Sequence, residues 1–95
     1  MVDVKISFFS ILTDITDKEE LIFSLENNSD IRILLEKLVL KYGKAFEEQI
    51  FKNSANLSKY VLITVNGKDI RALDGLNTKL KQDDEIFFVP AIAGG

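Results

Sequence analysis

The group in this sequence with the clearest chemistry is the carboxylate of Gly95, which follows a second glycine, Gly94. Because glycine has no Cβ, two in a row can be drawn fully extended into a narrow enzyme channel. A terminal carboxylate has a reference pKa of about 3.5 and is ionised at neutral pH. It is a weak nucleophile and a poor electrophile, so a partner enzyme must phosphorylate or adenylate it before it can accept sulfur or an amine. A frayed end or a cloning remnant is the alternative explanation of the two glycines.

The composition excludes most other chemistry. The 95 residues include seven phenylalanines, no cysteine and no histidine, so thiol nucleophiles, disulfides, zinc-finger patterns and a histidine base are all absent. A net charge of −3 argues against a nucleic-acid or anionic-membrane surface. We expect no bound cofactor and no metal. No signal-peptide pattern and no membrane span is apparent, so the sequence predicts a cytoplasmic protein.

Alternation of apolar and polar residues predicts five strands. The predicted strands are residues 2–9, 21–25, 60–65, 68–71 and 85–89. The polar residues 13–18 are interpreted as a turn, which makes the second strand the simplest hairpin partner of the first. Asn66-Gly67 is a strong hairpin signal between the third and fourth strands, because both residues tolerate positive φ.

Between the second and third strands the apolar period changes to that of an amphipathic helix. Its core-facing stripe is Ile31, Leu34, Leu35, Leu38 and Tyr42. Ser29 or Asp30 is the expected N-cap, and Gly43 is the expected C-cap. A weaker helical segment follows at residues 44–51.

Strands at both ends of the chain, with one long helix between them, predict an α+β fold of the β-grasp type. We expect a mixed sheet of about five strands packed on one main helix, with the two terminal strands side by side at its centre. Leu76 and Leu80 fill the side of the core from a loop. The β-grasp domain is expected to span residues 1–90, and residues 91–95 are expected to form a flexible tail ending in Gly-Gly.

Strand alternation also predicts an apolar patch on the open face of the sheet. If Phe88 points towards the helix, then Phe87 and Val89 point away from it. The same alternation places Phe9 and Leu62 outside, beside them. A monomer does not normally expose such a row, so these four residues are the expected partner interface. The alternative is that the short helix or a loop covers them.

Four stretches together resemble the small sulfur-carrier proteins of molybdenum-cofactor synthesis, the MoaD family, within the wider group of ubiquitin-like sulfur carriers. The stretches are Ile6-Ser7-Phe8-Phe9-Ser10 with Leu12, Val65-Asn66-Gly67, Leu80 to Glu85, and Val89 to Gly95. They cover nearly the whole chain in the family's order. An insertion around residues 43–60 makes this chain longer than the related thiamine-type carriers. It therefore favours a resemblance to the molybdopterin or tungstopterin carriers.

The resemblance implies a carrier, a covalent co-substrate of a sulfurtransferase complex and not itself a catalyst. Gly95 would be adenylated with ATP by a ubiquitin-activating-type enzyme, and a sulfur donor would then convert it to a thiocarboxylate. Gly94, Ala93 and Ile92 would thread this group into the large subunit of molybdopterin synthase, which supplies the catalytic side chains. Neither a nucleic acid nor a membrane is expected as a partner.

Three other functions stay open from the sequence. The chain could be a ubiquitin-like modifier joined through Gly95 to lysines of target proteins, a sulfur carrier for tRNA thiolation, or an interaction domain with an inert tail. Lys59, Lys68 and Arg71 flank the predicted hairpin and could meet an acidic partner, but a solvated edge is the preferred interpretation of them. The short acidic groups, such as Asp83-Asp84-Glu85, are interpreted as solvated surface.

Overall fold

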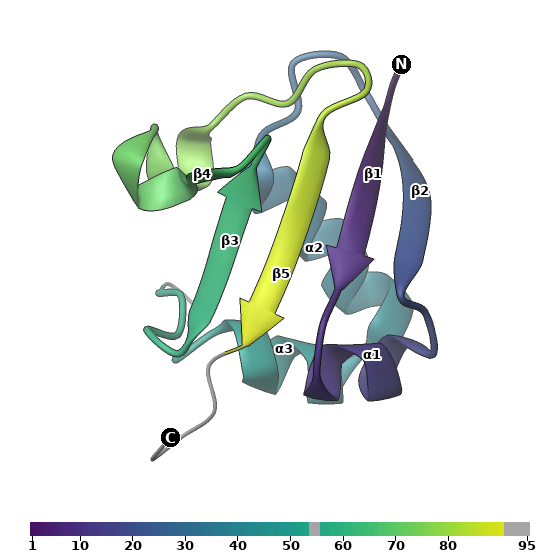
Figure 1. Ribbon diagram of the computed structural model, residues 1–95, viewed down its shortest axis with the longest axis vertical. Coiled ribbons are helices and arrows are strands. Elements are labelled where there is room, and N and C mark those ends of the chain that lie inside the picture. The colour runs from purple at the N-terminus through teal and green to yellow at the C-terminus, as the bar shows by residue number, and fades with distance from the viewer. Residues whose placement is uncertain (54–55, 91–95) are drawn as a thin grey trace.

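The computed structural model describes residues 1–53 and 56–90, which contain a five-stranded mixed sheet in the order β2-β1-β5-β3-β4 (Figure 1). The strands are β1 (Val2–Phe8), β2 (Glu20–Leu25), β3 (Val61–Val65), β4 (Lys68–Asp69) and β5 (Glu85–Pro90). The two terminal strands, β1 and β5, are parallel neighbours at the centre, and the other three pairs are antiparallel. The predicted central placement of the terminal strands is therefore confirmed.

The main helix, α2 (Ile31–Tyr42), packs against one face of the sheet, as Figure 1 shows. Its predicted stripe is buried from Ile31 to Leu38. Asp30 is the N-cap, because its carboxylate accepts a hydrogen bond of 3.0 Å from the Ile33 N–H. The Ser29 hydroxyl instead donates to the carbonyl of Glu26 at 2.7 Å. Gly43 ends the helix with φ of 84°, a conformation that favours glycine.

The core between the sheet and the helices contains an aromatic cluster. Phe46, on the short helix α3 (Lys44–Ile50), has its ring centroid 6.2 Å from that of Phe8 and 6.3 Å from that of Phe88. Tyr42 at the end of α2 completes the cluster, 5.8 Å from Phe46. Because Phe8 and Phe88 point to the α2 side of the sheet, α3 packs on that side as well. Leu80 is buried at the side of the core and Leu76 is partly buried against it, as predicted.

The prediction of a turn over residues 13–18 is wrong, because Ile11–Thr16 forms a helix, α1. Leu12 is fully buried and anchors this segment to the core. The Thr13 hydroxyl donates to the carbonyl of Phe8, and the Thr16 hydroxyl donates to that of Leu12. Six residues are too short to display a helical period, and tertiary packing decides their conformation.

The predicted return strand over residues 68–71 is also partly wrong. Only Lys68–Asp69 pairs with β3, and Ile70–Ala72 is a 3₁₀ turn, η1. A second 3₁₀ turn, η2, spans Gly75–Asn77. The chain turns after β4 because the Asp69 carboxylate accepts from the Arg71 N–H at 2.9 Å, while Ile70 is buried in the core. The third predicted strand begins one residue later than expected, since Tyr60 is exposed outside β3.

Candidate functional site

Four of the predicted site residues, Ile92, Ala93, Gly94 and Gly95, lie outside the described residues, so their roles stay predictions. The structure does describe the strand that precedes them. β5 ends at Pro90, opposite Val61 of β3, and it is held between β1 and β3. Residue 91 therefore follows directly from a strand that is paired on both sides.

The register of β5 determines which of its aromatic residues face outwards. Leu62 lies opposite Val89 in the antiparallel pair of β3 and β5, and Thr64 lies opposite Phe87. Residues directly opposite each other share one face of a sheet. Phe88 is fully buried, whereas Phe87 is 39% exposed and Leu62 is 37% exposed. The predicted parity of the last strand is therefore confirmed.

Phe9 reaches the same surface from the other end of the chain. It lies one residue beyond β1, and its ring centroid is 5.5 Å from that of Phe87. Ser10, which follows with φ of 57°, turns the chain into α1. We call Phe9, Leu62, Phe87 and Val89 the apolar patch. Within residues 1–53 and 56–90 no helix lies on this face of the sheet, so the alternative of a covering short helix is wrong (Figure 1).

The apolar patch lies at the end of the sheet where β5 leads into residues 91–95. Val89 precedes Pro90, the last residue of β5, and Leu62 adjoins Val61, the partner of Pro90. Towards β2 the same face carries an ion pair, with Lys5 Nζ 3.6 Å from Glu20 Oε2, and the exposed side chain of Ile22 opposite Lys5. A partner that covers the apolar patch is therefore positioned to receive the residues that follow Pro90.

The acidic residues near the last turn have a structural role. The Asp84 carboxylate accepts hydrogen bonds from Asn66 Nδ2 at 2.9 Å and from the Lys81 N–H at 2.8 Å. The side-chain oxygen of Asn66 in turn accepts from the Glu85 N–H at 2.9 Å. These bonds tie the β3–β4 hairpin to the start of β5. Among the described residues, no group of three or more acidic side chains could hold a metal ion.

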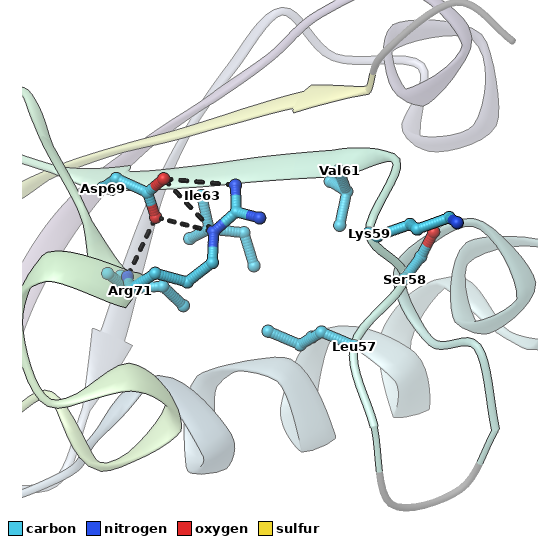
Figure 2. A pocket seen from close by; sticks show the side chains of 8 residues that line it. Leu57, Ser58, Lys59, Val61, Ile63, Asp69 and Arg71 are labelled. Carbon is cyan, nitrogen blue, oxygen red and sulfur yellow. Dashed lines mark hydrogen bonds and ion pairs between the residues drawn. The ribbon is translucent and has the colours of Figure 1, made fainter.

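One feature near the site was not predicted, a recess of about 230 Å³ at the edge of β3 (Figure 2). Its lining includes Lys59 and Arg71, which the sequence had singled out. In the sequence, only these two cations, one on either side of the strand, indicated the position of the recess. The recess itself depends on the turn after β4, which strand periodicity does not reveal.

Comparison with known proteins places the chain among ubiquitin-like carriers. A family model described as the ThiS family matches residues 6–95. A candidate sulfur carrier protein of Archaeoglobus fulgidus is 36% identical over 78 residues, which cover 73% of this chain and 88% of that protein. Both findings agree with the resemblance noted from the sequence.

Solved structures agree in fold. Small archaeal modifier protein 1 from Methanosarcina acetivorans has a TM-score of 0.81 at 32% identity and covers 100% of this chain and 98% of its own. A candidate molybdopterin converting factor, subunit 1, from Pyrococcus furiosus has a TM-score of 0.79 at 23% identity. The match covers 97% of this chain and 100% of that protein. The predicted ubiquitin-like β-grasp fold is confirmed. In the described part of the chain, no helix has the length and apolar character to cross a membrane, and the cytoplasmic location stays a prediction.

Proposed function

The chain belongs to the ThiS family of ubiquitin-like sulfur carriers, and we propose that it is the small subunit of a molybdopterin synthase. It carries sulfur as a thiocarboxylate on Gly95 for the synthesis of a molybdenum or tungsten cofactor. The observation that carries the proposal is the position of the apolar patch beside Pro90, at the start of the tail. The likeness to the P. furiosus protein, at 23% identity, supports the fold of such a subunit.

The proposed activation takes place on a partner enzyme of the ubiquitin-activating type. A carboxylate oxygen of Gly95 attacks the α-phosphorus of ATP and displaces pyrophosphate, which leaves an acyl-adenylate. Hydrosulfide supplied by a sulfur donor then attacks the acyl carbon and displaces AMP, so that the terminus becomes a thiocarboxylate. The two terminal glycines offer no side chain to obstruct the approach of either reactant.

The proposed transfer takes place in the large subunit of the synthase. The apolar patch binds that subunit, and the tail places the thiocarboxylate sulfur, a nucleophile, against a cyclic pterin precursor. The large subunit supplies the acid and base groups, because this chain has neither histidine nor cysteine. This chain therefore acts as a carrier, which presents a reactive group, and the large subunit catalyses its transfer.

A second candidate function is protein modification, with Gly95 joined to lysines of target proteins. The observation that favours it is the 32% identity with small archaeal modifier protein 1 over the whole chain. Sulfur transfer to tRNA would begin with the same activation step. The three functions differ in what becomes of the activated terminus.

The deciding experiment follows the terminus of the chain purified from its native cell. Under the proposal, intact mass spectrometry finds a species heavier by the exchange of one oxygen for sulfur. That species converts a pterin precursor when the large subunit is added, and a chain lacking Gly95 does not. Lysine-linked forms without turnover of the precursor would replace the proposal with protein modification. Turnover by the chain lacking Gly95 would overturn both.

A further inference from the structure

The recess at the edge of β3 has an apolar interior. Leu57, Val61, Ile63 and Ile70 line it, and Figure 2 shows Leu57 and Val61 on opposite sides of the hollow. Its volume of about 230 Å³ is below the roughly 300–1,000 Å³ of small-molecule pockets. The recess therefore suits one aliphatic side chain better than a cofactor.

The recess is open because β4 is short. β4 pairs only with Thr64 and Val65 of β3, so Val61–Ile63 has no strand beside it on that edge within the described part of the chain. Ile70, where a longer strand would continue, turns inwards to the core. The 3₁₀ turn then carries Arg71 back over the recess (Figure 2).

Arg71 is held in place by Asp69. The guanidinium donates from Nε to the Asp69 carboxylate at 3.2 Å, and its Nη2 lies 3.1 Å from Asp69 Oδ2. The hydrogen bonds from Arg71 keep the pKa of the Asp69 carboxyl below its usual value. A guanidinium has five N–H donors, so the edge that Asp69 does not use remains able to bind a second carboxylate.

Lys59 lines the opposite end of the recess from Arg71, and Figure 2 shows its side chain extending away from the hollow. Its Nζ lies 5.4 Å from the centre of the exposed Tyr60 ring, and no ion pair within 4.0 Å involves it among the described residues. Lys59 and Arg71 outweigh Asp69, so the rim is positive by one charge on a chain whose net charge is −3. The exposed Lys59 side chain can rotate towards the hollow, which has the Arg71 guanidinium at its other edge. An apolar hollow with these two cations at its ends matches an aliphatic side chain flanked by carboxylates.

From this match we infer that the recess between Lys59 and Arg71 binds an acidic segment of a partner protein, which inserts one aliphatic side chain. The carboxylates beside that side chain contact the Arg71 guanidinium and the Lys59 ammonium. Because Asp69 already orients Arg71, binding loses little side-chain entropy there.

This site is separate from the apolar patch. Val61 and Ile63 point to the helix side of the sheet, whereas Leu62 between them points to the open face. A protein bound to the apolar patch and a segment bound in the recess therefore use different faces of β3. The inference does not depend on sulfur transfer and holds equally for a protein modifier.

The test is a titration of the full-length ¹⁵N-labelled chain, followed by NMR, with a capped peptide in which one leucine is flanked on both sides by aspartates. The expected result is a shift of the amides of Leu57, Lys59, Ile63 and Arg71, with those of Phe9 and Phe87 unmoved. A matched peptide with asparagines in place of the aspartates should bind at least tenfold more weakly. Added salt should also weaken the binding of the acidic peptide.

Variants distinguish specific binding in the recess from non-specific electrostatic binding of the acidic peptide to the protein surface. Lys59→Glu and Arg71→Gln should each lower the affinity at least threefold, and the double variant at least tenfold. Lys68→Glu is the matched control, since Lys68 is exposed on β4 and does not line the recess, so its affinity should stay within twofold. The inference is overturned if the acidic peptide causes no shift at millimolar concentration, if it shifts the apolar patch instead, or if Lys68→Glu weakens binding as much as Lys59→Glu.

Discussion

Phe9 and Phe87 are 78 positions apart in the sequence, yet their ring centroids are 5.5 Å apart on the open face of the sheet. The contact follows from the parallel pairing of β1 with β5, in which Ser7 lies opposite Phe87. The two rings join Leu62 and Val89 in the apolar patch beside Pro90. The position of this patch connects the fold with the proposed carrier function.

Phe87→Ala should leave the melting temperature nearly unchanged and lower the affinity for the large synthase subunit at least about tenfold. Phe87 is 39% exposed, and aromatic residues at the centre of an interface often carry about 2 kcal/mol or more of binding energy. Calorimetry and titration on the same samples measure both quantities.

Phe88→Ala is the matched control for Phe87→Ala. Phe88 is fully buried and meets the ring of Phe8 at 5.8 Å, so its truncation should cost about 3–5 kcal/mol of unfolding free energy. If Phe87→Ala melted the protein and Phe88→Ala spared it, the assigned register of β5 would be wrong.

Leu35→Ala or Leu38→Ala should each destabilise the fold by about 2–5 kcal/mol, because both side chains are fully buried between α2 and the sheet. Leu40→Ala on the same helix removes an 86% exposed side chain and should change the stability by no more than about 0.5 kcal/mol. Urea denaturation gives the three values. Equal losses for Leu38→Ala and Leu40→Ala would refute the assigned core face of α2.

Replacing Gly94 with valine should abolish adenylation by the cognate activating enzyme and leave the melting temperature unchanged. A Cβ at this position narrows the backbone angles available to the tail and obstructs a slot that admits glycine. ATP–pyrophosphate exchange measures the activation. Ile22→Ala, on the far edge strand β2, is the control and should be activated normally. A Gly94→Val protein that is adenylated at the normal rate would contradict the proposed threading of the tail.

Tyr42→Phe should keep or slightly raise the stability at neutral pH. The Tyr42 ring packs against the rings of Phe8 and Phe46, and its buried hydroxyl has no hydrogen-bond partner among the described residues. Its loss therefore removes an unpaired polar group. A clear loss of stability at neutral pH in urea denaturation would show that the hydroxyl has a partner.

The stability of Tyr42→Phe should also differ from that of the wild-type protein at alkaline pH. Burial raises the pKa of the Tyr42 phenol above its ordinary value of about 10. The unfolded chain then releases this proton at a lower pH than the folded chain. This titration leaves the stability unchanged below about pH 10 and lowers it as the pH rises through the folded-state pKa. The wild-type protein should therefore lose more stability than Tyr42→Phe between neutral pH and pH above about 10. Parallel losses in the two proteins would contradict the raised pKa.

Most of the fold could be predicted from local patterns. The period-two alternation of β1, β3 and β5 and the stripe of α2 from Ile31 to Leu38 are long enough to identify each element and its buried face. Strand parity then follows from geometry, because successive side chains point to opposite faces. For this reason the outward positions of Phe87 and Leu62 were predictable without any tertiary contact.

Local sequence patterns were enough to predict β1, β2, β3 and β5, the main helix, the parity of the last strand and the chemical character of a Gly-Gly terminus. Tertiary structure alone decided the rest. α1 exists because Leu12 is buried, and Ile70 leaves the edge of the sheet because its side chain is buried in the core. The joining of Phe9 to Phe87 and the recess between Lys59 and Arg71 depend on residues distant in sequence. Local propensity reflects the conformational preference of an isolated segment. These features are instead stabilised by the burial of side chains between segments that come into contact only in the folded chain.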